Sequence, residues 1–308
     1  MLVTDQSRVV YRHFIRDSTR WDGFVFRPDD IVISTPSKCG TTWLQMICAL
    51  LVFQSPALPE PLSRLSPWLD MVTRPLGDVL ADLEAQQHRR FIKTHTPLDG
   101  VPWDPRVTYI GIGRDPRDVA VSFDNHRAIQ DRDALVRARA SVLGDGADDP
   151  FRQMPRLPTP RERFWFWVDD ATPPSQSVST LWMTLHHLNT YWQVRDQSNV
   201  ILLHYRELLA DLDGQMRALA RKLAIAVPEN DWPELVRAAT LEQMRARADA
   251  LAPNVELGIW RDNARFFHRG GSGTWRDFLD EADLARYYRR VAELAGPDLA
   301  AWVHNDSH

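Results

Sequence analysis

Short apolar runs alternate with helical patterns over the first two thirds of the chain. Runs rich in Val, Ile, Phe and Tyr predict β-strands at residues 31–34, 90–94, 107–112 and 200–205. Helical patterns lie between them, at 42–53, at 116–127 and along a face marked by Leu181, Leu185, Leu188 and Trp192. This alternation predicts an α/β fold with a central, mostly parallel sheet flanked by helices. Ligands of such folds bind at the carboxyl ends of the strands.

The region from about residue 128 to 176 departs from this pattern. It is charged, turn-rich and interrupted by prolines, so we expect a lid or insertion within a single domain of residues 1–308. Thr159-Pro160-Arg161-Glu162 has the form of a capping box, which predicts the start of a helix. The aromatic residues 164–167 either pack this segment onto the core or line an acceptor pocket. We favour packing, because large aromatic side chains usually serve burial.

Charge and composition restrict the classes of partner. The 308 residues include 37 Lys and Arg against 41 Asp and Glu, a net charge of −4, so the chain has no basic field for nucleic acid. The longest apolar run, 43–53, is too short to span a bilayer, and no signal peptide precedes it. Two cysteines are too few for a disulfide framework or a cysteine zinc site. We therefore expect a cytoplasmic protein without integral membrane association, in which any anion site is local.

The first predicted strand leads into a segment suited to binding an anion, Lys38-Cys39-Gly40-Thr41-Thr42. Backbone N–H groups at a helix N-terminus carry partial positive charge and lack intrahelical partners, so a phosphate can bind there beside the lysine. In a Walker A loop a glycine opens the loop and the lysine follows the last glycine, whereas here Lys38 precedes Gly40. The segment predicts a phosphorylated ligand, but not an ordinary ATP or GTP site.

Two further segments favour anions. Arg114 ends the third strand and Ser122 follows two helical turns later, so the two can clamp a phosphate; the alternative is a surface arginine paired with Asp115 or Asp118. Residues 269–273 place three glycines within four positions after an arginine, which suits an anion-binding nest or a plain surface turn. Three separate signals indicate a ligand with several phosphate-like groups, such as a bisphosphate nucleotide.

The second strand ends at Lys93-Thr94-His95, at the same edge of the sheet as the first anion segment. A histidine there can accept a proton from an attacking hydroxyl group, although a lone histidine is more often structural. His186 and His187 are adjacent and would diverge on a helix, and no other histidine spacing is typical of metal ligands. We therefore expect a general base without a metal ion.

These segments resemble the motifs of sulfotransferases that use 3′-phosphoadenosine 5′-phosphosulfate (PAPS). Residues 35–43 resemble the 5′-phosphosulfate loop, 93–97 the catalytic-base segment, 113–122 the 3′-phosphate motif and 269–275 the last nucleotide-binding loop. They follow the order of the family, and the chain looks closest to actinobacterial members such as the mycobacterial glycolipid sulfotransferase. The resemblance implies a P-loop-like nucleotide-binding sulfotransferase fold.

The resemblance also implies roles for individual residues. His95 would be the general base and Lys38 and Lys93 the other catalytic residues. Trp43 would stack on adenine, and Arg114, Ser122 and Arg269 would hold the 3′-phosphate. The whole donor site would comprise Lys38, Cys39, Gly40, Thr41, Thr42, Trp43, Arg114, Ser122, Tyr205, Thr240, Leu241, Met244, Arg269, Gly270 and Gly271. Leu241 stands where the family usually has a phenylalanine, and Cys39 where it usually has a serine.

The implied reaction is in-line transfer of the sulfuryl group of PAPS to a hydroxyl group, leaving adenosine 3′,5′-bisphosphate (PAP). The acceptor would be a small molecule, a phenol or a glycolipid, and the oligomeric state is open. Lys38 would either stabilise the leaving phosphate or serve ground-state binding alone. Two alternatives to a sulfotransferase are a magnesium-dependent nucleotide kinase on a related sheet and a non-catalytic nucleotide-binding protein.

Overall fold

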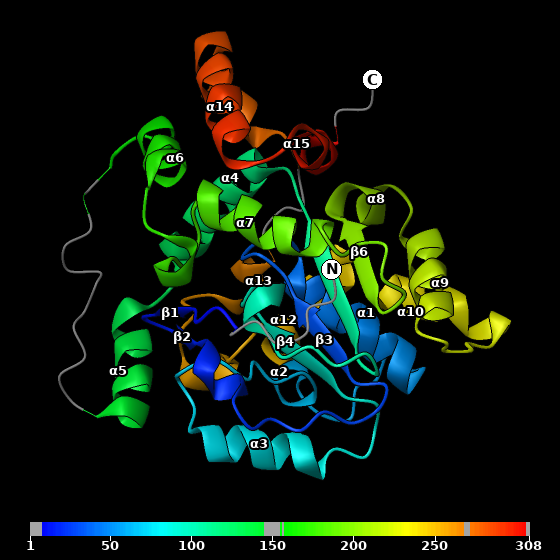
Figure 1. The fold of residues 1–308 in the computed structure, drawn as a ribbon. Helices are drawn as coiled ribbons and strands as arrows, with labels where there is room; N and C mark the ends of the chain where they lie inside the picture. Colours follow the sequence, from blue (N-terminus) through cyan, green and yellow to red (C-terminus); the bar gives the residue numbers. More distant parts are fainter. Residues whose placement is uncertain (1–7, 145–154, 156, 268–271, 306–308) are drawn as a thin grey trace.

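The predicted parallel sheet forms the centre of the molecule (Figure 1). The computed structural model describes residues 8–144, 155, 157–267 and 272–305. The strand order is β4-β3-β5-β6, and every neighbouring pair is parallel. The strands are β3 (Ile31–Ser34), β4 (Phe91–Thr94), β5 (Thr108–Gly113) and β6 (Val200–His204). All strand predictions are confirmed to within one residue at each end.

Helices surround this sheet, and the three predicted helical patterns are confirmed as α1, α4 and α7. The α-helices are α1 (Thr41–Phe53), α2 (Leu62–Leu65), α3 (Leu76–Ala85), α4 (Pro116–Ile129), α5 (Arg132–Leu143), α6 (Pro160–Asp169), α7 (Leu181–Trp192), α8 (Tyr205–Ala210), α9 (Leu212–Lys222), α10 (Trp232–Ala238), α11 (Leu241–Ala246), α12 (Ala248–Leu251), α13 (Asn263–Phe266), α14 (Glu281–Leu294) and α15 (Pro297–His304). A short antiparallel pair, β1 (Arg12–His13) and β2 (Arg16–Asp17), lies near the N-terminus. The sequence did not predict this pair, nor the helices that follow β6.

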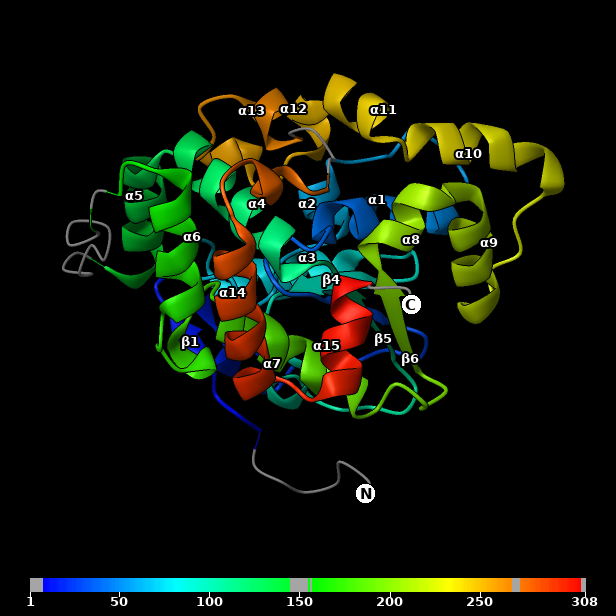
Figure 2. The same ribbon diagram turned by 90° about the horizontal axis from the view of Figure 1, so that it is seen from above.

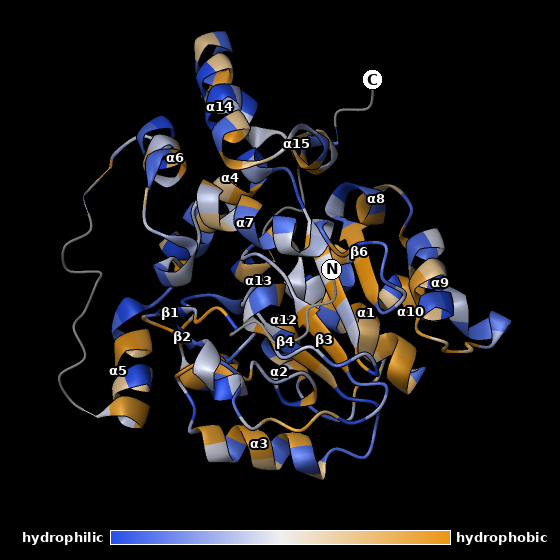
Figure 3. Cartoon of the chain, in the orientation of Figure 1, coloured by the Kyte–Doolittle hydropathy of each residue, from blue (hydrophilic) through white to orange (hydrophobic). Residues whose placement is uncertain are grey.

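The sheet is buried on both faces, which explains why its strands are continuous apolar runs (Figure 3). Ile31 and Ile33 belong to one core cluster, while Val32, which points the other way, belongs to a second cluster. Helix α1 lies on one side of the sheet and α7 on the other, as the two views agree (Figures 1 and 2). In the described residues, no helix has the length and apolar character needed to cross a bilayer.

Helix α6 begins where the capping box predicts it. The Thr159 hydroxyl accepts from the Glu162 N–H, and the Glu162 carboxylate accepts from the Thr159 N–H. Phe164 and Trp167 are buried in the main core and Trp165 packs against it, which confirms the packing interpretation for these three residues, whereas Phe166 is exposed. None of residues 164–167 lines the cavity at the sheet edge, so the pocket interpretation is wrong. The proposed single domain and lid remain predictions.

The strand register gathers the predicted motifs at one edge of the sheet. Ser34 pairs with Thr94 and Gly113 with His204, so all four strands end close together. The loop to α1, the residue His95, the start of α4 and the start of α8 leave from this carboxyl edge. A ligand site at this edge therefore takes its side chains from segments that are distant in the sequence.

Candidate active site

A cavity of about 420 Å³ lies at the carboxyl edge of the sheet. A volume of this size suits a small-molecule ligand. The predicted site residues that line it are Lys38, Gly40, Thr41, Thr42, Trp43, Lys93, His95, Arg114, Ser122, Tyr205, Leu241 and Met244. The structure thus brings together residues from the first, second and third strand ends and from α4, α8 and α11.

The remaining predicted residues lie elsewhere or are not described. The Cys39 side chain is fully buried in the core, and Thr240 caps α11 by accepting from the Gln243 N–H. Both stand next to residues that line the cavity, but their own side chains do not line it. Arg269, Gly270 and Gly271 lie outside the described residues.

The loop before α1 places backbone amides against the cavity. Gly40 caps the helix with a left-handed φ of 107°, and a Cβ atom there would lie 2.9 Å from the Tyr205 ring. Only glycine fits such a close approach in this conformation. Lys38 is also left-handed, with φ 67°, and its position in the turn directs its side chain into the cavity while Cys39 enters the core. The unpaired N–H groups of the first turn of α1 therefore lie beside Lys38.

Arg114 crosses from the end of β5 to the same loop. Its guanidinium donates to the Lys38 carbonyl oxygen at 3.0 Å and lies 4.5 Å from the centre of the Tyr205 ring. The neighbouring carboxylates have partners of their own: Asp115 pairs with Arg117, and Asp118 accepts from Ser272 and from the Gly273 N–H. Asp118 thereby ties the described end of the predicted segment at 269–273 to the start of α4.

Two lysines lie in the cavity wall against aromatic rings. Lys38 Nζ lies 4.7 Å from the centre of the Phe266 ring, and Lys93 Nζ lies 4.7 Å from the Trp68 ring. Burial, together with repulsion from Arg114 and Lys93, lowers the pKa of Lys38 to about 7. Burial also lowers the pKa of Lys93 to about 8, against the opposing influence of Asp70. Within the described part of the chain, neither lysine forms an ion pair with a carboxylate, so a bound anion would be their counter-ion.

His95 is held in one orientation. Its Nδ1 lies 2.8 Å from the Thr35 carbonyl oxygen, and because a carbonyl only accepts, Nδ1 carries the hydrogen and Nε2 keeps its lone pair. The ring packs edge-on against Trp68, and the His95 carbonyl oxygen accepts from the buried Arg16 guanidinium. Burial, reinforced by Lys93, lowers the pKa of His95 well below its ordinary value. A neutral imidazole with a free Nε2 is what a general base requires.

The sequence analysis missed several residues of the cavity. His126 lies four residues after Ser122 on the same face of α4, and that spacing was the available signal. Beyond it lies a surface that we call the apolar wall, formed by Ile15, Trp68, Met71, Leu135, Ile259, Trp260 and Phe266. These residues come from distant segments and share no local pattern.

Comparison with known proteins decides the family. The family described as "Sulfotransferase domain" matches residues 28–297. The chain belongs to the sulfotransferase family. This sulfotransferase is 46% identical to a glycolipid sulfotransferase of Mycobacterium bovis, over 96% of this chain and 94% of that protein. It is also 46% identical to a glycolipid sulfotransferase of Mycobacterium tuberculosis, with the same coverage of both chains.

Solved structures share the fold of this sulfotransferase. A mouse sulfotransferase complexed with PAP superposes with a TM-score of 0.66 at 18% identity, over 93% of this chain and 92% of that one. Retinol dehydratase in complex with retinol and PAP gives a TM-score of 0.67 at 21% identity, over 90% of this chain and 84% of that one. The predicted fold, and the predicted enzyme class of PAPS-dependent sulfotransferases, are confirmed. The kinase and the non-catalytic alternatives are set aside.

Proposed function

We propose that this enzyme transfers the sulfuryl group of PAPS to a hydroxyl group of a glycolipid, with His95 as general base. The observation that carries the proposal is that three features line one cavity. They are the loop before α1 that carries Lys38, which we call the cationic loop, the Nε2 side of His95, and the apolar wall. The 46% identity to the two mycobacterial glycolipid sulfotransferases supports this acceptor class. The free, buried cysteines Cys39 and Cys48 suit a cytoplasmic location, which is part of the proposal.

The donor would lie along the carboxyl edge of the sheet. Lys38 and the amides of Gly40, Thr41 and Thr42 hold the 5′-phosphosulfate, because a helix N-terminus with an adjacent lysine complements its charge. Arg114 and Ser122 hold the 3′-phosphate, with help from residues 269–271. The adenine packs between Trp43 and Leu241; Trp43 is fixed by donation from its Nε1 to the Ala239 carbonyl oxygen at 2.8 Å.

The reaction follows from where these groups lie. His95 Nε2 takes the proton of the acceptor hydroxyl as its oxygen attacks sulfur, while the bond from sulfur to the 5′-phosphate oxygen breaks. Lys38 donates to that leaving oxygen and stabilises the charge that develops on it. Lys93, beside Trp68 and His95, adds positive charge on the side of the transferred group.

The apolar wall would hold the lipid part of the acceptor. Its seven residues form one side of the cavity, and Leu135 comes from the proposed lid region at 128–176. Removing hydrocarbon surface from water stabilises a complex by about 25 cal/mol for each Å² buried, so an alkyl chain on this wall binds favourably. The sugar then lies between the wall and the two lysines, close to His95.

The test is transfer of label from ³⁵S-PAPS by the purified enzyme to a panel of glycolipids, matched phenols and a steroid alcohol. We expect labelled glycolipid at the highest kcat/KM and no label with Lys38→Met. Trp260→Ala should raise KM for the glycolipid while leaving the affinity for PAP unchanged. Preferential labelling of phenols, with glycolipids inert, would contradict the acceptor that we propose.

A further inference from the structure

His126 is a second imidazole in the cavity, and the proposed reaction gives it no role. Its Nδ1 lies 3.3 Å from Lys38 Nζ. Its ring packs 4.9 Å from Trp260 and 5.9 Å from Phe266, centre to centre, so it stands where the cationic loop meets the apolar wall. It lines the same cavity as His95.

The two imidazoles differ in the hydrogen bond that Nε2 can form. A protonated lysine can only donate, so His126 Nδ1 accepts from Lys38 and the ring hydrogen sits on Nε2. That Nε2 has no partner in the described part of the structure and is not among its buried unpaired polar atoms, so it opens on the cavity. His95 has the reverse arrangement, in which Nδ1 donates to Thr35 and Nε2 accepts. The cavity therefore offers one nitrogen that accepts and one N–H that donates.

We infer that His126 selects acceptors in which the reacting hydroxyl has a neighbouring oxygen, as in the vicinal diols of a sugar ring. His95 Nε2 accepts the proton of the reacting hydroxyl, and His126 Nε2–H donates to the adjacent oxygen. An isolated alcohol or a simple phenol lacks that second oxygen and leaves the N–H unpaired. The inference rests on the proposed function, because it takes His95 as the base and a sugar as the acceptor.

Lys38 links this selection to the donor. An ammonium group has three N–H donors, so Lys38 keeps two for the phosphosulfate while one remains on His126. The contact fixes the tautomer of His126 as long as Lys38 is charged. The phosphosulfate of a bound donor favours the charged lysine, so donor binding also favours the form of His126 that donates to the sugar.

The experiment compares octyl β-glucoside with its single-deoxy analogues and with octanol, all with ³⁵S-PAPS. For the wild type we expect sulfation at one ring position and about a tenfold lower kcat/KM when the oxygen next to that position is removed, the usual effect of one hydrogen bond. His126→Asn places an amide near the position of Nδ1 and keeps the Lys38 contact, but it does not reach the sugar. This variant should lose the tenfold discrimination, because its kcat/KM for the glucoside should fall to its kcat/KM for the deoxy analogue.

His126→Gln serves as the complementary variant, because its amide reaches the position of Nε2 and should retain part of the discrimination. His88→Asn is the matched control, since His88 contacts Phe53 and Arg89 outside the cavity. PAP binding by calorimetry checks that each variant is folded. If His126→Asn does not fold, His126→Gln carries the test, because it should retain only part of the wild-type discrimination.

Equal kcat/KM for the glucoside and every deoxy analogue in the wild type would overturn the inference and leave the proposed function standing. Discrimination that persists in His126→Asn would also overturn it, because another group would then recognise the second oxygen. Transfer to phenols with no transfer to any glycoside would overturn the proposed function and the inference together.

Discussion

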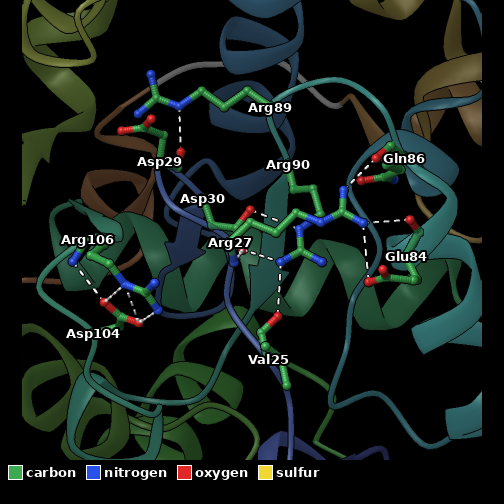
Figure 4. Close-up of polar contacts among 10 residues, drawn as sticks. All are labelled: Val25, Arg27, Asp29, Asp30, Glu84, Gln86, Arg89, Arg90, Asp104 and Arg106. Atoms are coloured by element: carbon green, nitrogen blue, oxygen red, sulfur yellow. Dashed lines mark hydrogen bonds and ion pairs between the residues drawn. The ribbon is translucent and has the colours of Figure 1, made fainter.

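The two ends of the central sheet use their cationic side chains in opposite ways. At the amino end, Arg90 donates to Asp30 with both side chains buried, Arg106 pairs with Asp104, and Arg27 donates to the carbonyl oxygens of residues 84 and 86 (Figure 4). At the carboxyl end, Lys38 and Lys93 lie against a histidine and aromatic rings.

This difference separates structural charge from functional charge. A buried cation with a carboxylate partner satisfies its own charge, and removing either partner leaves the other buried and unpaired. A buried cation without a carboxylate has a lowered pKa, as Lys38 does, and gains a counter-ion when an anion binds. The amino end should therefore determine stability, and the carboxyl end should determine donor binding and turnover.

The largest expected effect is on turnover at the carboxyl end. His95→Ala removes the only group that we assign to proton removal, so kcat should fall about 10²- to 10⁴-fold, the range typical of general base catalysis. PAP affinity measured by calorimetry should stay within a few-fold of wild type. His186→Ala, outside the cavity, is the control. Near-normal kcat with saturating acceptor would remove His95 from the mechanism.

Breaking the buried pair at the amino end should reduce stability instead. Arg90→Met keeps most of the side-chain volume but leaves Asp30 buried without its charged partner, so the free energy of unfolding should fall by about 3–5 kcal/mol. Urea denaturation measures this change. The remaining folded enzyme should bind PAP normally. A loss of PAP affinity in the folded variant would contradict this account, because the amino end of the sheet would then also determine donor binding.

Donor binding should depend on pH because of Lys38. Its pKa of about 7 in the empty site should rise beside a bound phosphate, so PAP binding takes up a proton above pH 7. The Kd of PAP should then increase by up to about tenfold for each pH unit above 7. Calorimetry at pH 8 in two buffers of different ionisation enthalpy measures the uptake. Lys38→Arg should reduce it, because a guanidinium stays charged; an unchanged uptake would assign the effect to other groups.

The smallest effect is expected at the exposed pair of the amino end. The Arg106 side chain is 57% exposed, so Arg106→Ala should lower the free energy of unfolding by less than about 1 kcal/mol. Chemical denaturation beside Arg90→Met gives the comparison. A loss as large as that of the buried pair would show that exposure does not govern the strength of these pairs.

Sequence patterns predicted those parts of the molecule that depend on neighbouring residues. The strand at 31–34 and the start of α1 follow from a continuous apolar run, a glycine and a helix N-terminus. The capping box at Thr159 is equally local. These features could be predicted because their physical causes lie within a few residues.

The rest depends on contacts between distant segments. The apolar wall joins Ile15, Leu135 and Trp260, and no periodicity relates these residues. The buried Arg16, which holds the His95 carbonyl, had no recognisable signal because a buried guanidinium is rare. His126 could have been found from its spacing to Ser122, but its contact with Lys38 needed the structure.

The most direct test of the central claim is a crystal structure of the enzyme with PAP bound. The account predicts the 5′-phosphate at Lys38 and the first turn of α1, the 3′-phosphate at Arg114 and Ser122, and the Nε2 of His95 facing the space where the sulfuryl group would lie. PAP bound away from Lys38 and Arg114, or His95 turned away from the 5′-phosphate, would contradict it.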